Sequence, residues 1–168
     1  KAERIIAISA SAAHDLRDML PGDQLTEKTR IIYQGKSPLF YPQSHDAVAQ
    51  FKAQHQLGSY ILYVGTRKLH KNLGRMVQAY ARLKNDFLEL QLVVVGNKSP
   101  EDEIGLWKER LGITGIVESP WVSMTQLSLF YCGAEALIVP SLYEGFGLPP
   151  LEAMACGTPV VVSKTSSL

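Results

Sequence analysis

The sequence predicts a doubly wound, Rossmann-like α/β fold, in which helices cover both faces of a parallel sheet. Apolar runs such as residues 60–65 and 90–96 are continuous rather than alternating, which is typical of strands buried on both faces. These runs alternate with segments of helical character, as parallel strands joined by crossover connections require. The chain has 168 residues, which is enough for one domain with a substantial core.

The elements can be placed in order from the apolar runs and their breakers. The predicted strands are residues 4–9, 28–33, 60–65, 90–96, 116–117, 136–140 and 159–162. The predicted helices are residues 11–20, 46–57, 72–83, 101–111, 125–132 and 150–156. Pro21 and Gly22 should end the first helix and Gly58 the second, while Asn72 should cap the helix that it begins.

Composition narrows the possible functions. Seventeen basic and sixteen acidic residues nearly cancel, so the charge balance suggests neither a nucleic-acid partner nor an anionic membrane surface. The sequence shows no signal-like leader and no apolar run of transmembrane length, which predicts a cytoplasmic protein. Cys132 and Cys156 lack metal-ligand spacing and are expected to be buried free thiols. The four histidines lack such spacing too, so no metal is expected.

Residues 141–157 form the strongest candidate site, because a strand, a glycine-bearing loop and a helix N-terminus follow one another there. A helix N-terminus suits a phosphate, and Gly145 and Gly147 let the backbone approach a ligand closely. The carboxylates of Glu144 and Glu152 suit hydrogen bonds from sugar or ribose hydroxyls. Glu152, expected in the first helical turn, could equally serve to complement the helix dipole.

Three loops should leave strands at the carboxyl edge of the sheet, where folds of this class bind ligands. They are residues 65–71, residues 96–99 and the loop of Glu144. Arg67 and Lys71 in the first loop could clamp a diphosphate, because arginine binds phosphate oxygens bidentately and lysine is a compact charge. From the residues alone, a solvated loop is the better interpretation.

Residues 140–161 resemble the group-1 (family-4) retaining glycosyltransferases nearly throughout. Glu144 and Glu152, with seven residues between them, look like the E-x7-E signature of that family. Residues 63–73, YVGTRKLHKNL, are similar to its "YVGxxxxxKNL" stretch, whose basic residues hold the donor diphosphate. Residues 118–127 resemble its "FLGYVS..EL" segment, with Pro120 in place of the usual glycine.

The resemblance implies the C-terminal half of a GT-B glycosyltransferase. Residues 1–28 would be the end of the N-terminal acceptor domain with its linker, and residues 29–168 the nucleotide-sugar donor-binding domain, truncated at both ends. Such an enzyme would move a hexose, of mannosyl or glucosyl type, to an acceptor sugar or lipid-linked glycan held by the N-terminal domain. It would need neither a metal nor a cofactor. Without that domain the fragment is expected to be inactive.

The resemblance also assigns roles to single residues. Glu144 would be the catalytic carboxylate beside the transferred sugar, and Glu152 would accept hydrogen bonds from the ribose. Arg67 would substitute for an arginine that the family places earlier. Trp121 is expected to pack rather than to stack on a base. The donor-binding residues expected in this way are Gly65, Arg67, Lys71, Val122, Gly145, Phe146, Gly147, Leu148 and Glu152.

Two other functions remain open at this point. One is a nucleotide-sugar epimerase or a phosphorylase of similar architecture, and the other is a non-catalytic α/β binding module, because such sheets host many functions. The fingerprints GxGxxG and GxxxxGK[ST] are absent, which counts against nicotinamide dehydrogenases and P-loop phosphatases. The loops suggest GDP- or UDP-linked donors without choosing between them.

Overall fold

A computed structural model describes residues 2–20 and 23–168, so the helix end predicted at Pro21 and Gly22 lies outside the described residues. The strands are β1 (Ile5–Ala7), β2 (Thr29–Ile31), β3 (Tyr60–Val64), β4 (Gln91–Val95), β5 (Ile116–Ser119), β6 (Ala136–Val139) and β7 (Val160–Val162). The helices are α1 (Ala10–Met19), α2 (Asp23–Lys28), α3 (His45–Gln54), the 3-10 turn η1 (Leu69–Lys71), α4 (Leu73–Asp86), α5 (Ile104–Leu111), α6 (Met124–Gly133) and α7 (Leu148–Ala155).

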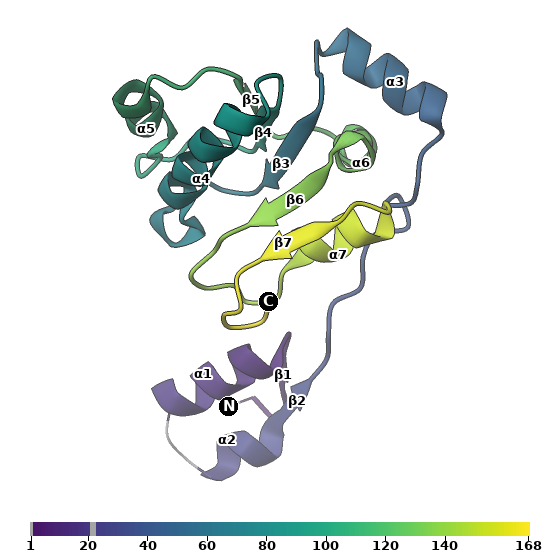
Figure 1. Cartoon of the computed structure of the whole chain (residues 1–168). Coiled ribbons are helices and arrows are strands. Elements are labelled where there is room, and N and C mark those ends of the chain that lie inside the picture. The colour runs from purple at the N-terminus through teal and green to yellow at the C-terminus, as the bar shows by residue number, and fades with distance from the viewer. Residues whose placement is uncertain (1, 21–22) are drawn as a thin grey trace.

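Five parallel strands form the main sheet, in the order β5-β4-β3-β6-β7. From β3 the chain first builds outward through β4 and β5, then returns to place β6 on the other side of β3. The strand order therefore reverses between β3 and β6, and in doubly wound folds ligands bind beyond the carboxyl ends of the strands at this point. In Figure 1 these ends point toward the N-terminal part of the chain. The predicted doubly wound, Rossmann-like fold is confirmed.

Helices cover both faces of this sheet, with α4 and α5 on one face and α3, α6 and α7 on the other (Figure 1). The strands divide their side chains between two cores accordingly. Val93 and Val95 pack with the α3, α6 and α7 side, whereas Leu92 and Val94 pack with the α4 and α5 side. Burying such a side chain contributes roughly 1.5–3 kcal/mol, and burial on both faces explains why the strands are continuously apolar.

The N-terminal segment forms a small unit of its own. Strands β1 and β2 pair in parallel as a two-stranded sheet beside α1, and residues 32–44 then cross to α3 (Figure 1). The side chain of Ser9 caps α1 by accepting the N–H of Ala12 at 3.0 Å. Strand β2, with which the predicted donor-binding domain begins, therefore lies outside the five-stranded sheet.

Some element boundaries differ from the predictions for local reasons. Helix α2 was not predicted. Helix α3 ends at Gln54, before Gly58, which had been expected to stop it, and Gln56 takes a left-handed conformation with φ 54°. Helix α5 begins at Ile104 rather than at residue 101, because the side chain of Asp102 accepts the N–H of Ile104 at 3.0 Å.

Helix α7 also begins earlier than predicted, at Leu148 instead of Pro150. Both prolines then lie in the first turn, where a missing N–H removes no hydrogen bond of the helix. Gly157, just beyond the helix, has φ 83°, a left-handed conformation that glycine adopts without steric penalty at a helix end.

Candidate functional site

Lys71 and Glu144 form an ion pair where the strand order reverses. Lys71 ends η1 in the loop after β3, and Glu144 lies in the loop after β6. The ammonium group lies 2.7 and 2.8 Å from the two carboxylate oxygens, and the side chains are only 17% and 16% exposed. Ser141 also donates its hydroxyl to Glu144 at 2.7 Å. The expected catalytic carboxylate and the expected diphosphate lysine are thus brought into contact.

Hydroxyl groups near the C-terminus hold the Glu144 loop in place. Ser166 accepts the N–H of Glu144 at 2.8 Å, and Ser167 donates to its carbonyl at 2.7 Å. Thr165 donates to the carbonyl of Ser141 at 3.1 Å. None of these residues was singled out from the sequence, although a run of hydroxyl side chains directly after β7 was a visible signal.

The backbone between this loop and α7 is rich in free donors. Among the described residues, no group accepts the N–H of Gly145, Phe146, Gly147 or Leu148. Gly147 precedes the helix with φ 100°, a conformation that other residues adopt only with strain. Pro149 contributes no N–H. The anion-binding capacity expected of the helix N-terminus therefore lies in these four consecutive residues.

Glu152 lies in the second turn of α7, not in the first as predicted, and the first turn holds no acidic residue. This position weakens the interpretation that it merely complements the helix dipole. Tyr131 of α6 donates its hydroxyl to the carboxylate at 2.8 Å. Burial raises the pKa of Glu152 above its usual value, and the hydrogen bond from Tyr131 opposes that shift.

Glu152 is one of the residues that line a mainly apolar pocket of about 350 Å³. Its lining residues are Phe40, Val64, Trp121, Val122, Met124, Leu127, Leu148, Pro149 and Glu152. Three expected donor-binding residues, Val122, Leu148 and Glu152, thereby share one cavity. Trp121, which is expected to pack rather than to stack on a base, is 47% exposed and forms part of the wall of this pocket. A larger depression of about 440 Å³ follows the outer face of α4, away from every expected site residue.

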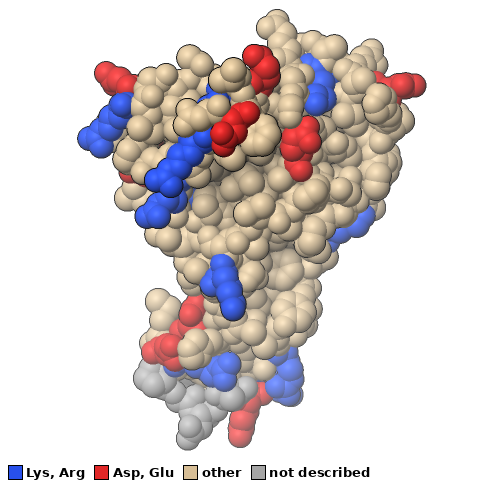
Figure 2. Space-filling model, viewed as in Figure 1, with Lys and Arg blue, Asp and Glu red and all other residues tan. Residues whose placement is uncertain are grey.

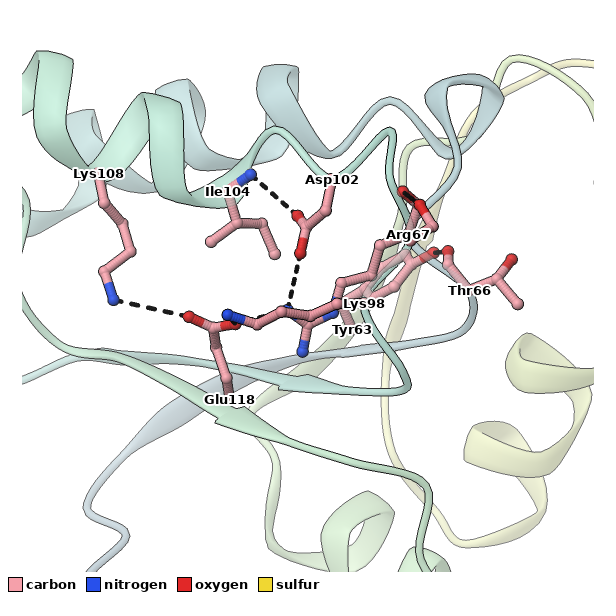
Figure 3. A network of polar contacts seen from close by, with 9 residues as sticks. Tyr63, Thr66, Arg67, Lys98, Asp102, Ile104, Lys108 and Glu118 are labelled. Atoms are coloured by element: carbon pink, nitrogen blue, oxygen red, sulfur yellow. Dashed lines mark hydrogen bonds and ion pairs between the residues drawn. The ribbon is translucent and has the colours of Figure 1, made fainter.

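Arg67 is placed differently from the expectation. Its side chain is 2% exposed, and Nη1 lies 3.0 Å from Asp102 and 2.5 Å from Glu118 (Figure 3). A diphosphate would have to compete with two carboxylates for this buried guanidinium. A sequence cannot show this arrangement, because the two carboxylates follow 35 and 51 residues later.

Gly65, another expected donor-binding residue, lies where its neighbours leave no room for a side chain. A Cβ at Gly65 would lie 2.9 Å from the Tyr63 hydroxyl, and one at the neighbouring Gly96 would lie 2.0 Å from the carbonyl oxygen of Gly65. The two loops therefore touch through their backbones. Asn72, expected to cap α4, has φ 58° and instead donates its side-chain amide to the carbonyl of Pro140 at 3.1 Å. That bond joins the Lys71 loop to the end of β6.

Phe146 and the N-terminal unit meet beside the site. The Phe146 ring lies 6.2 Å from that of Tyr33, between centroids, and Ser9 donates its hydroxyl to the Gly145 carbonyl at 2.7 Å. Neither contact was predicted.

Cys156 is buried, whereas Cys132 is only partly buried, and both are free thiols. Across residues 2–20 and 23–168, no group of three or more histidine, cysteine, aspartate or glutamate side chains could hold a metal ion. Within the same residues, no helix combines the length and the apolar character needed to cross a membrane. Charged side chains are scattered over the face shown in Figure 2.

Comparison with protein families and curated proteins gives a consistent result. The family model described as "Glycosyl transferases group 1" matches residues 48–168. The chain is 40% identical over 113 residues to O-antigen chain mannosyltransferase B of Escherichia coli, covering 65% of this chain and 29% of that protein. It is 28% identical over 181 residues to the serotype-specific mannosyltransferase WbdA of Escherichia coli, covering 100% and 21%. The chain therefore spans less than a third of these relatives.

Solved structures share the fold. Sucrose-phosphate synthase from Thermosynechococcus elongatus superimposes with a TM-score of 0.82 at 30% identity, over 100% of this chain and 42% of that one. HepE from Anabaena, in complex with UDP-glucose, gives 0.86 at 20% identity, over 99% and 46%. These neighbours are GT-B glycosyltransferases, which confirms the expected architecture.

Proposed function

This chain belongs to the group 1 glycosyl transferases, and from that premise we propose that it forms the donor-binding half of a retaining hexosyltransferase that uses a nucleotide-diphosphate sugar. One observation carries the proposal. Where the strand order reverses, Lys71 pairs with Glu144, and four free backbone N–H groups follow Glu144 in the chain. The last of them belongs to Leu148, which lines a pocket together with Glu152.

The donor can be placed along this series of groups. The nucleoside would occupy the 350 Å³ pocket, with its base beside Val122 and its ribose hydroxyls donating to Glu152. The diphosphate would lie over the free N–H groups that end at Leu148, within reach of Lys71. The sugar would then lie beside Glu144. An apolar base, an anion and a polyhydroxyl sugar would each meet groups of suitable chemistry in this order.

These groups also suit the reaction. Charge grows on the diphosphate as the bond to the sugar breaks, and backbone N–H groups with the Lys71 ammonium would stabilise it. Glu144 would accept hydrogen bonds from the sugar and support positive charge that develops on it. Because the lysine and the N–H groups supply positive charge, the proposed reaction proceeds without a metal. Arg67 would support the diphosphate site through the loop that it holds rather than by direct contact.

The relatives narrow the proposed substrate. Two proteins that resemble this chain are mannosyltransferases, and HepE of similar fold holds UDP-glucose. We therefore propose a hexose donor of mannosyl or glucosyl type and an acceptor hydroxyl on a sugar or lipid-linked glycan. The acceptor would bind across the cleft, on the portion that the relatives have beyond the length of this chain. The chain alone is expected not to transfer sugar.

Calorimetric titration with UDP, GDP and ADP tests the proposal. We expect one nucleotide to bind, and Glu152→Ala to weaken it by about ten- to a hundredfold, the loss of a charge-assisted hydrogen bond. Glu109→Ala, the same change at an exposed glutamate of α5, should leave the affinity unaltered. Equal affinity in the Glu152→Ala variant would remove Glu152 from the ribose site. If neither this chain nor the full-length protein binds any of the three nucleotides, the donor-binding role is refuted.

A further inference from the structure

Glu118, near the end of β5, is surrounded by three positive side chains (Figure 3). Its carboxylate lies 2.5 Å from Nη1 of Arg67, 3.2 Å from Nζ of Lys98 and 3.6 Å from Nζ of Lys108. These three residues come from the loop after β3, the loop after β4 and helix α5. A single carboxylate thus joins three segments at the carboxyl edge of the sheet.

The Arg67 loop is also held through its backbone. Ser99 donates its hydroxyl to the carbonyl of Arg67 at 2.6 Å, and Tyr63 donates to the carbonyl of Thr66 at 2.7 Å. Glu101 accepts the N–H of Leu69 at 3.2 Å. The loop is therefore fixed through Arg67 and Leu69 against the segment between β4 and α5, and through Thr66 against β3.

The placement of Arg67 depends on two carboxylates. The guanidinium is buried, and Nη1 makes its ion pairs with Asp102 and Glu118. Nε has no hydrogen-bond partner among the described residues. A buried charge that loses a partner is strongly destabilised where it lies. Burial alone would raise the pKa of Glu118, but hydrogen bonds and positive charge from Arg67 and Lys98 outweigh it and lower that pKa. The carboxylate is therefore ionised at neutral pH.

The far end of the same loop carries Lys71. Its N–H donates to the carbonyl of Lys68 at 2.9 Å, and Leu142 donates its N–H to the carbonyl of His70 at 2.8 Å. The Lys71 side chain then reaches Glu144. Residues 65–71 thus connect the ion cluster around Glu118 to the Glu144 loop.

We propose that Glu118 is a positioning residue of the donor site: by holding Arg67 it fixes the loop of residues 65–71 and so sets the place of the Lys71 ammonium beside Glu144. Its meaning for the diphosphate rests on the proposed function, but the placement of Lys71 does not. Glu118 itself is not among the residues that line the pocket of Glu152.

Hydrogen exchange tests the placement without any ligand. Glu118→Gln keeps the shape of the side chain and removes its charge, and Glu109→Gln, at an exposed position of α5, is the matched control. We expect the amides of Lys71 and Asn72 to exchange about tenfold faster in Glu118→Gln, with β4 amides unchanged. Asp102→Asn, which keeps an oxygen for the N–H of Ile104, should act in the same direction and serves if Glu118→Gln does not fold. Unchanged loop amides in the folded variants would overturn the proposal.

Ligand binding supplies a measurement that a purely structural role would not alter. The nucleotide found to bind among UDP, GDP and ADP is compared with its nucleoside, which has no phosphate. We expect Glu118→Gln to weaken binding of the nucleoside diphosphate about tenfold and to leave the affinity for the nucleoside unchanged. In a Lys71→Met background, Glu118→Gln should not weaken diphosphate binding further. Equal weakening of both ligands, or the same weakening with Lys71→Met, would overturn the proposal. Faster loop exchange without binding of any nucleotide would support the placement of Lys71 and refute the proposed function.

Discussion

Lys71 and Glu144 should be energetically coupled in folding, because they join loops that are 73 residues apart in the chain. The perturbation is a double-mutant cycle of Lys71→Met, Glu144→Gln and both together. Methionine keeps the length of the lysine without its charge, and glutamine keeps an oxygen for the Ser141 hydroxyl. Only the ion pair is lost in both single variants.

The expected magnitude follows from the geometry of the pair. Charge-assisted hydrogen bonds contribute about 1.5–3 kcal/mol, whereas exposed ion pairs contribute about 0–1 kcal/mol. With two contacts of 2.7 and 2.8 Å and side chains 17% and 16% exposed, the pair lies nearer the first class. We expect each single variant to lose about 2 kcal/mol of unfolding free energy and the double variant to lose no more, a coupling of about 2 kcal/mol.

Urea unfolding measures this coupling. For a slope of about 2 kcal/mol per molar urea, each variant should unfold at a midpoint about 1 M lower. Lys68→Met, at an exposed lysine of the same loop, should leave the midpoint nearly unchanged. If the losses of the single variants simply add in the double variant, to within about 0.5 kcal/mol, the pair does not stabilise the site and the reasoning is wrong.

Three further predictions follow from the same site. Because the pKa of Glu152 is raised, acidification should protonate this carboxylate, and so weaken nucleotide binding, at a pH above the usual carboxyl range. Tyr131→Phe removes a hydrogen bond that lowers this pKa, so in calorimetric titrations across pH the midpoint of the loss of affinity should move upward. An unchanged midpoint would show that the hydrogen bond does not affect the pKa of Glu152. Gly147→Ala should lower the free energy of unfolding in urea by about 1–2 kcal/mol, because φ is 100° and the new Cβ would lie 2.8 Å from a leucine methyl group. Gly145→Ala, where the nearest atom would lie 3.6 Å from the new Cβ, should lower it by less than about 0.5 kcal/mol. Equal losses of stability in the two variants would contradict the strain argument. Glu144→Gln should tighten nucleoside diphosphate binding by about three- to tenfold in the same calorimetric assay, since the diphosphate no longer competes with a carboxylate for the lysine; weaker binding would contradict that competition.

The meeting of Lys71 and Glu144 was foreseeable from the sequence for a topological reason. Both residues follow continuously apolar strands, and the carboxyl ends of parallel strands share one edge of the sheet. The pattern of apolar residues does not show the order of the strands. Doubly wound sheets, however, generally reverse their strand order at a switch point. Long-range proximity therefore followed from local periodicity together with that rule.

Arg67 shows where such reasoning stops. An arginine in a loop with two lysines and a histidine is expected to be solvated, and nothing local indicates burial. Its environment depends on Asp102 and Glu118, which tertiary structure brings to it from other segments. The partner of Glu152 was hidden for the same reason, because Tyr131 reads as one more apolar residue of α6. Contacts between side chains of different helices, strands and loops leave no repeating pattern in the sequence from which they could be predicted.

The charges of the site are arranged so that the unliganded protein already satisfies them. Arg67 is neutralised by Asp102 and Glu118, and Lys71 by Glu144, so the unpaired positive potential comes from backbone N–H groups. Under the proposed function, a diphosphate that approaches those groups would draw Lys71 away from Glu144, and the same movement would free that carboxylate for the sugar. One ion pair would then couple occupation of the phosphate site to exposure of Glu144. A residue that only holds the Lys71 loop, such as Glu118, would accordingly affect both steps without touching the donor.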